Sequence, residues 1–151
     1  MSRSCLTSIG ILFLLIGLNA NAQGADGPPG KLALLPGYKH EPLQGIDSIV
    51  GRISKPKGLV IQYEIGRVAK PGAPALGGDF TNQAKAIPMA ALKWFKEQRL
   101  GEQTVNVALT QQDVLFVTYP DSGVNFTVTV KTPEELADAL LMLLTYRGTK
   151  E

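Results

Sequence analysis

The side chains in this sequence that could carry out acid–base chemistry are few and lie far apart. His40 is the only histidine, and it stands beside Glu41 in a proline-rich stretch. A histidine oriented by a carboxylate, here Glu41 or Asp47, can act as a general base near neutral pH. No nucleophile is attached to it by a known spacing, and a His-Glu neighbour pair in such a stretch is typical of a solvated surface. We therefore assign no catalytic residue.

The sequence contains no known motif for binding a metal ion or a cofactor. One histidine is too few for the zinc motifs that use two, such as H-E-x-x-H, and the aspartates lack the spacing of a calcium loop. The glycine-rich stretch 72–78 lacks the Gly-Lys-Ser/Thr ending of a phosphate-binding loop. None of Ser48, Ser54 and Ser122 lies in G-x-S-x-G. We expect neither a bound metal nor a cofactor.

The best candidate for a binding site lies at the end of an alternating segment, residues 59–65. Tyr63, Glu64 and Arg67 stand there, ahead of a long stretch rich in glycine and proline. An arginine at a strand end beside an irregular loop can clamp an anionic group of a ligand or partner. The alternative is that Arg67 pairs with Glu64 or with water. With His40, these three residues are our candidate ligand-binding residues.

Residues 1–22 have the three parts of a cleavable export signal. Arg3 gives a positive start, and residues 5–18 are an uncharged apolar run that is too short to span a bilayer. An A-x-A site ends at Ala22, so cleavage would leave Gln23 as the first mature residue. The only cysteine, Cys5, leaves with the signal, so the mature chain would form no disulfide.

The composition and charge fit a single globular domain with no polyanionic partner. The chain has 151 residues, of which 44% are hydrophobic and 19% charged. Its net charge is +2, and removal of Arg3 leaves 14 basic against 13 acidic residues. This near-balance argues against nucleic acid and against a polybasic membrane patch. We expect a protein or small-ligand partner outside the cytoplasm, periplasmic or secreted, and no stable membrane anchor after signal cleavage.

The mature chain divides into a proline- and glycine-rich N-terminal arm, residues 23–45, and one α+β domain, residues 46–151. Alternating apolar residues and short turns predict six strands, at 46–54, 58–65, 91–99, 103–109, 114–119 and 124–130. A long loop at 67–90 interrupts them, and a short helix ended by Pro88 is expected within it at 82–87. The strand order across this loop stays open.

A helix closes the chain. Thr132 is a good N-cap, Pro133 takes the first helical position and Glu135 completes a capping box. The leucine-rich stripe at 136–144, which we expect to include Leu141, needs a sheet to cover, and Gly148 is expected to end the helix in the left-handed conformation. The predicted fold is α+β: an antiparallel meander of about six strands with the C-terminal α-helix packed on one face.

These features favour an exported, non-catalytic binding or interaction module. Two alternatives remain. One is a small secreted hydrolase that uses His40 with a nearby carboxylate. The other is an envelope structural protein that assembles through exposed strand edges.

Overall fold

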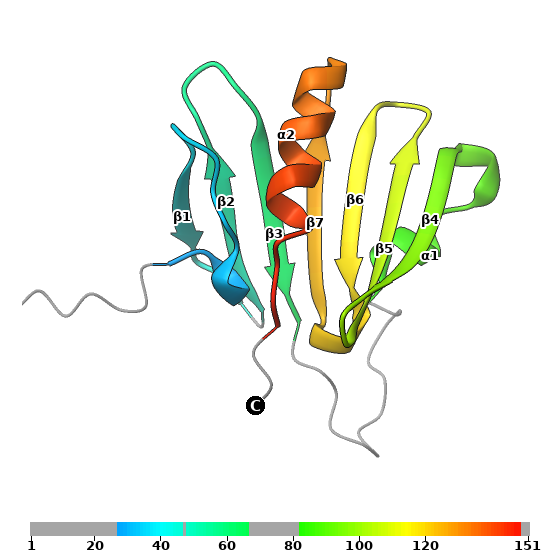
Figure 1. The fold of residues 1–151 in the computed structure, drawn as a ribbon, viewed down its shortest axis with the longest axis horizontal. Helices are drawn as coiled ribbons and strands as arrows, with labels where there is room; N and C mark the ends of the chain where they lie inside the picture. The colour runs from blue at the N-terminus through cyan, green and yellow to red at the C-terminus, as the bar shows by residue number, and fades with distance from the viewer. Residues whose placement is uncertain (1–26, 47, 67–81, 149–151) are drawn as a thin grey trace, which may run out of the picture.

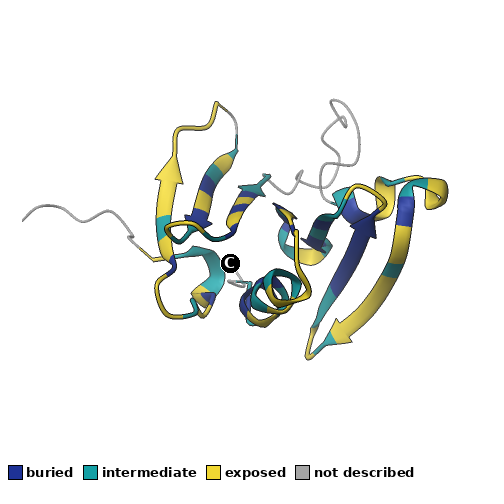
Figure 2. Cartoon of the chain, turned by 90° about the horizontal axis from the view of Figure 1, so that it is seen from above, coloured by how far each residue is buried: buried dark blue, intermediate teal, exposed yellow. Residues whose placement is uncertain are grey.

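The computed structural model describes residues 27–46, 48–66 and 82–148, which form a seven-stranded antiparallel sheet curved around a C-terminal helix (Figures 1 and 2). The strands are β1 (Lys39–Leu43), β2 (Ile49–Ser54), β3 (Val60–Ile65), β4 (Leu92–Leu100), β5 (Gln103–Thr110), β6 (Val114–Tyr119) and β7 (Val124–Thr129). The helices are α1 (Gln83–Ala86), α2 (Pro133–Leu143) and the 3-10 turns η1 (Pro29–Lys31), η2 (Met89–Ala91) and η3 (Pro120–Ser122). The α+β prediction is confirmed. The expected export signal, residues 1–22, lies outside the described residues.

The strand order is β1-β2-β3-β7-β6-β5-β4. The predicted β2–β3 hairpin and the β4-to-β7 meander are both present, but β3 joins β7 instead of β4. The register places Tyr63 opposite Phe126, so two large apolar side chains meet on the face that α2 covers. A seventh strand, β1, comes from the N-terminal arm and pairs with β2. β2 itself begins at Ile49, three residues after the expected start at Ile46.

The core lies between the sheet and α2. The rings of Tyr119, Phe126 and Tyr146 pack on one another, and all three are buried. The Tyr119 hydroxyl donates to the carbonyl of Leu143 over 2.8 Å, which fixes the last turn of α2 to the end of strand β6. Burying a side chain of this size contributes roughly 1.5–3 kcal/mol, so this cluster is a main source of stability.

Two expectations about α2 are wrong. Leu141 is 63% exposed, because it lies on the flank of the helix and not on the stripe formed by Ala139, Met142 and Leu143. Gly148 does not have the positive φ angle of a left-handed residue. The helix ends earlier, at Leu143, and Leu144 still has a right-handed helical conformation. A Cβ atom on Gly148 would lie 2.3 Å from the Ser122 hydroxyl, so a larger residue here would displace the Ser122 side chain.

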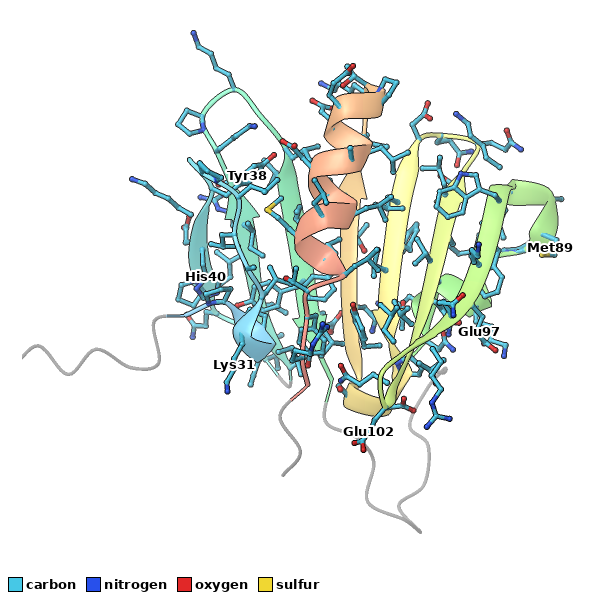
Figure 3. All side chains as sticks on the ribbon, viewed as in Figure 1. Lys31, Tyr38, His40, Met89, Glu97 and Glu102 are labelled. Atoms are coloured by element: carbon cyan, nitrogen blue, oxygen red, sulfur yellow. The ribbon has the colours of Figure 1, made fainter. Side chains whose placement is uncertain are left out.

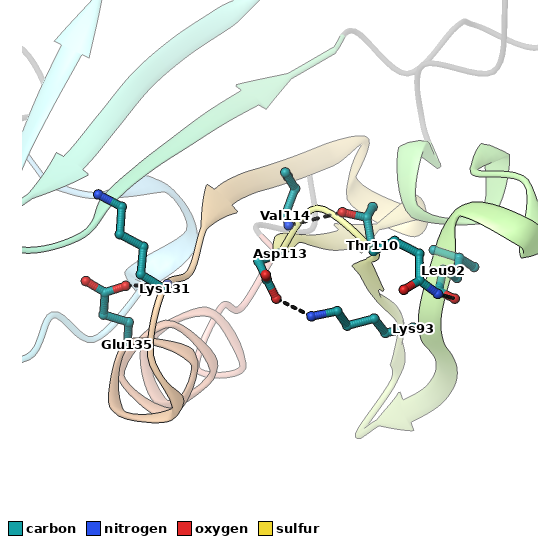
Figure 4. A network of polar contacts seen from close by, with 8 residues as sticks. Leu92, Lys93, Thr110, Asp113, Val114, Lys131 and Glu135 are labelled. Atoms are coloured by element: carbon teal, nitrogen blue, oxygen red, sulfur yellow. Dashed lines mark hydrogen bonds and ion pairs between the residues drawn. The ribbon is translucent and has the colours of Figure 1, made fainter.

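The N-terminus of α2 is capped almost as its sequence predicts (Figure 4). The Thr132 hydroxyl accepts from the Glu135 N–H over 3.2 Å. The Glu135 carboxylate accepts from the N–H of Lys131 over 2.6 Å, one residue before the position of a standard capping box. Both bonds satisfy backbone donors that helical bonding leaves free.

The opposite face of the sheet carries the short helix α1, which corresponds to the helix expected at 82–87. Its first N–H groups are held by side chains: Gln83 donates to the Asn125 Oδ1 over 3.1 Å, and Ala84 donates to the Thr118 Oγ1 over 3.2 Å. Ala84 also packs on Ala108 in a small apolar cluster. The interior strand β6 is therefore covered on both faces, as its apolar sequence predicts.

The arm packs beside α2. The Ala33 N–H donates to the Thr145 Oγ1 over 2.8 Å, and the Tyr38 hydroxyl donates to Asp138 of α2 over 3.1 Å. Lys55, in the β2–β3 turn, forms an ion pair with the same carboxylate over 3.1 Å and lies 4.7 Å from the Tyr38 ring centre. Three segments distant in sequence thus meet at one point.

The buried Tyr119 hydroxyl makes the free energy of unfolding depend on pH in the alkaline range. Burial raises the pKa of its hydroxyl from 10.0 to about 12. As pH rises, the unfolded chain therefore loses this proton first, so the stabilisation is complete below about pH 10 and is lost towards pH 12. We expect the free energy of unfolding, measured with urea, to fall in this window.

The matched variant is Tyr119→Phe. It should lose about 1 kcal/mol at neutral pH with its hydrogen bond, and its stability should fall less steeply above pH 10. Equal alkaline slopes for the two proteins would contradict the assignment.

Candidate functional site

The structure brings together two of the four candidate binding residues, His40 and Tyr63. They come from different strands, β1 and β3, and both project towards the α2 side of the sheet, where Figure 3 labels His40 beside the arm. The His40 Nε2 and the Tyr63 hydroxyl oxygen are 2.7 Å apart, and the two rings stack with centroids 5.7 Å apart. The contact therefore spans the intervening strand β2.

Gly51 of β2 makes this contact possible. It is the register partner of Tyr63, and the tyrosine ring lies directly over it. A Cβ atom at position 51 would lie 2.3 Å from the Tyr63 hydroxyl oxygen and 2.4 Å from the ring carbon that bears it. No side chain larger than hydrogen fits there without displacing the ring.

The His40–Tyr63 contact connects the edge strand β1 to the buried part of β3. Tyr63 is 5% exposed and its ring packs against Phe126. Burial raises the pKa of the Tyr63 hydroxyl above its ordinary value of 10.0, so this group stays protonated into the alkaline range. The second ring nitrogen of His40, Nδ1, is buried and has no hydrogen-bond partner among the described residues.

Of the two carboxylates proposed to assist His40, only Glu41 lies in the described structure, and it does not contact the histidine side chain. Glu41 projects to the opposite face of the sheet from its neighbour, where its carboxylate accepts from Arg52 over 2.8 Å. Asp47 lies outside the described residues. Glu41 is therefore not the carboxylate that orients His40 in the described structure.

The other two candidates are not joined to this pair. Glu64 follows Tyr63 in β3 and so projects to the opposite face, where it accepts from the Ser48 hydroxyl over 2.9 Å. Arg67 is outside the described residues. Tyr63 and Glu64 are neighbours in β3, so their side chains face opposite sides of the sheet and do not form one site.

Sequence reasoning missed an exposed apolar surface at the tip of the β1–β2 hairpin. Leu43 is 45% exposed, Ile46 104% and Ile49 64%; we call these three residues the hairpin-tip patch. The sequence placed Ile46 inside a strand, whereas it lies in the connecting loop. Ile49 pairs in register with the partly buried Ile65, on the same face as Tyr63, whereas Leu43 projects to the opposite face with Glu41.

A hollow lies beside the start of α2, next to the Lys131–Glu135 and Asp113–Lys93 contacts drawn in Figure 4. It is lined by Leu109, Asp113, Val130, Lys131, Thr132, Pro133 and Leu136. The carboxylate of Asp113 at the edge of this hollow already forms an ion pair with Lys93. The acidic residues Glu134 and Glu135 in the first turn disfavour an anionic ligand at this helix end.

Within residues 27–46, 48–66 and 82–148, no cluster of three or more histidine, cysteine or acidic side chains could hold a metal ion. No helix in the same residues is long and apolar enough to cross a membrane. Comparisons with known protein families, with curated proteins and with solved structures find no match to this chain.

The fit of Tyr63 over Gly51 can be tested by mutation. We expect Gly51→Ala to destabilise the protein by about 1–3 kcal/mol, because the added methyl group overpacks the site. In a Tyr63→Ala background the same change should cost much less, since the clashing ring is gone. Urea unfolding of the four proteins in this double-mutant cycle measures the coupling, and purely additive losses would refute the proposed contact.

Proposed function

We propose that this protein is an exported, non-catalytic interaction module that binds an apolar surface of a partner protein outside the cytoplasm. The hairpin-tip patch carries the proposal. Single exposed apolar side chains are ordinary, but a group of large ones at one end of a domain indicates an interaction site. Elsewhere in the described structure the exposed large apolar side chains, Val60, Met89, Trp94 and Leu141, are distributed over separate elements.

The state of His40 supports a binding function over catalysis. Its Nε2 is used in the contact with Tyr63, and the neighbouring Glu41 is paired with Arg52 on the other face. A general base has to reach a substrate proton within hydrogen-bond distance. Here the hydrogen bond of the imidazole holds an edge strand on the sheet.

The chemistry of the patch defines the kind of partner. Leu43, Ile46 and Ile49 offer aliphatic surface without a charge, so the fit is to an apolar depression or strip on a protein. The His40–Tyr63 contact joins β1 to β3 at the base of the hairpin, and a preformed strand pair reduces the conformational entropy that binding would cost.

The first prediction concerns export. If residues 1–22 are a cleaved signal, the protein isolated from the periplasm or medium should begin at Gln23, as read by N-terminal sequencing or intact mass. An Ala22→Tyr variant places a large residue at the A-x-A site, so it should accumulate as the uncleaved chain. A natural protein that still begins at Met1 would contradict export by this route.

The second prediction concerns the patch. A photo-crosslinking amino acid placed at Ile46 should join the protein to one discrete partner in intact cells, and Ile49→Asp should abolish that product. The same probe at Leu141, which is equally apolar and 63% exposed, is the matched control. Identical products from positions 46 and 141 would rule out the hairpin tip as the specific surface.

A further inference from the structure

The strand β4 leaves a long backbone edge open. It lies at one end of the sheet, and no strand pairs with its outer side in the described part of the chain (Figure 1). β4 has nine residues, whereas the opposite edge strand β1 has five and contains Pro42, which has no N–H to donate. Of the two edges, β4 is therefore the one suited to pair with another strand.

The β4–β5 turn shows which backbone groups face outward. Leu100 pairs with Gln103 across a two-residue turn that contains the left-handed Gly101. In such a hairpin the closing pair exchanges both backbone hydrogen bonds, and bonded residues then alternate along the strand. The N–H and C=O groups of Phe95, Glu97 and Arg99 therefore point away from β5.

The charges along this edge select one register for pairing with a second copy. A two-fold antiparallel pair centred on Lys96, Glu97 or Arg99 places that residue opposite its own copy, so like charges meet. A pair centred on Gln98 places Glu97 of each copy opposite Arg99 of the other. Opposite charges then meet twice.

A fifth register, centred on Phe95, fails for a different reason. A bulge interrupts β4 between Leu92 and Trp94, so the regular edge extends only from Trp94 to Leu100. A pair centred on Phe95 can use only residues 94–96 of each copy, because the next residue lies in the bulge. A pair centred on Gln98 can use residues 96–100, which all lie on the regular edge.

We propose that a second copy of this chain docks on β4, in an antiparallel pair centred on Gln98, with Glu97 and Arg99 forming two symmetric ion pairs. Glu97 is available for this, because its side chain is 50% exposed while it contacts Lys85 over 3.4 Å. Figure 3 shows Glu97 at the β4 end of the sheet. The Gln98 amide, which bonds the Arg99 carbonyl over 3.4 Å, is released as the second strand arrives.

A single-cysteine scan tests the register. In a Cys5→Ser background, one cysteine at a time replaces Lys96, Glu97, Gln98 or Arg99, and disulfide dimers are measured under mild oxidation. Gln98→Cys should crosslink fastest, because residues on the two-fold axis in a pair without backbone bonds bring their Cβ atoms close. Fastest crosslinking at another of these positions, or equal rates at all four, overturns the proposal.

A charge exchange tests the ion pairs in the same protein without added cysteine. Glu97→Arg and Arg99→Glu should each raise the dimer dissociation constant, from sedimentation equilibrium, by about tenfold. The double variant E97R/R99E should return it to near the original value. Lys96→Glu, which changes the other face of β4, is the matched control. A protein that stays monomeric to millimolar concentration, or a double variant that is not restored, overturns the proposal, whereas the hairpin-tip function is unaffected by either result.

Discussion

The structure depends on burying the apolar side of α2 in the hollow of a curved sheet. An 11-residue helix with Ala139, Met142 and Leu143 on one side cannot be covered by the β4–β7 meander alone. The β1–β3 strands extend the sheet past the helix on its other side, and the aromatic cluster around Phe126 fills the line where the two halves join. The hydrophobic effect thus determines where β3 is placed.

The same requirement explains why an unusual histidine contact lies near the sheet edge. β1 gains little from the core, since four of its five residues are exposed. Its attachment comes from backbone pairing with β2 and from His40, which reaches over Gly51 to the buried Tyr63 hydroxyl. A residue that suggests acid–base chemistry in the sequence therefore contacts the framework, and the hairpin beyond it carries the exposed side chains of Leu43, Ile46 and Ile49.

The sequence predicts well what depends on neighbouring residues. The Thr132 cap, the strand alternation and the short turns are local features, and each is found in the structure. The β3–β7 pairing, the Tyr63–Gly51 fit and the exposure of Leu141 depend on residues far apart in the chain, so periodicity alone could not reveal them. Ile46 was misplaced because a strand pattern cannot show where backbone pairing begins. His40 and Tyr63 were both selected, but their contact required the register of three strands.

The side-chain bonds that hold α1 also bear on covalent modification. Asn125-Phe126-Thr127 is a formal acceptor sequence for an N-linked glycan. In the folded protein Asn125 is 3% exposed, and its Oδ1 accepts from Gln83 and from the Thr118 hydroxyl. A sugar attached to this amide during synthesis would occupy the place of α1. Glycosylation at Asn125 and completion of the fold are therefore mutually exclusive, and a secretory route with oligosaccharide transfer would divide newly made chains between the two fates.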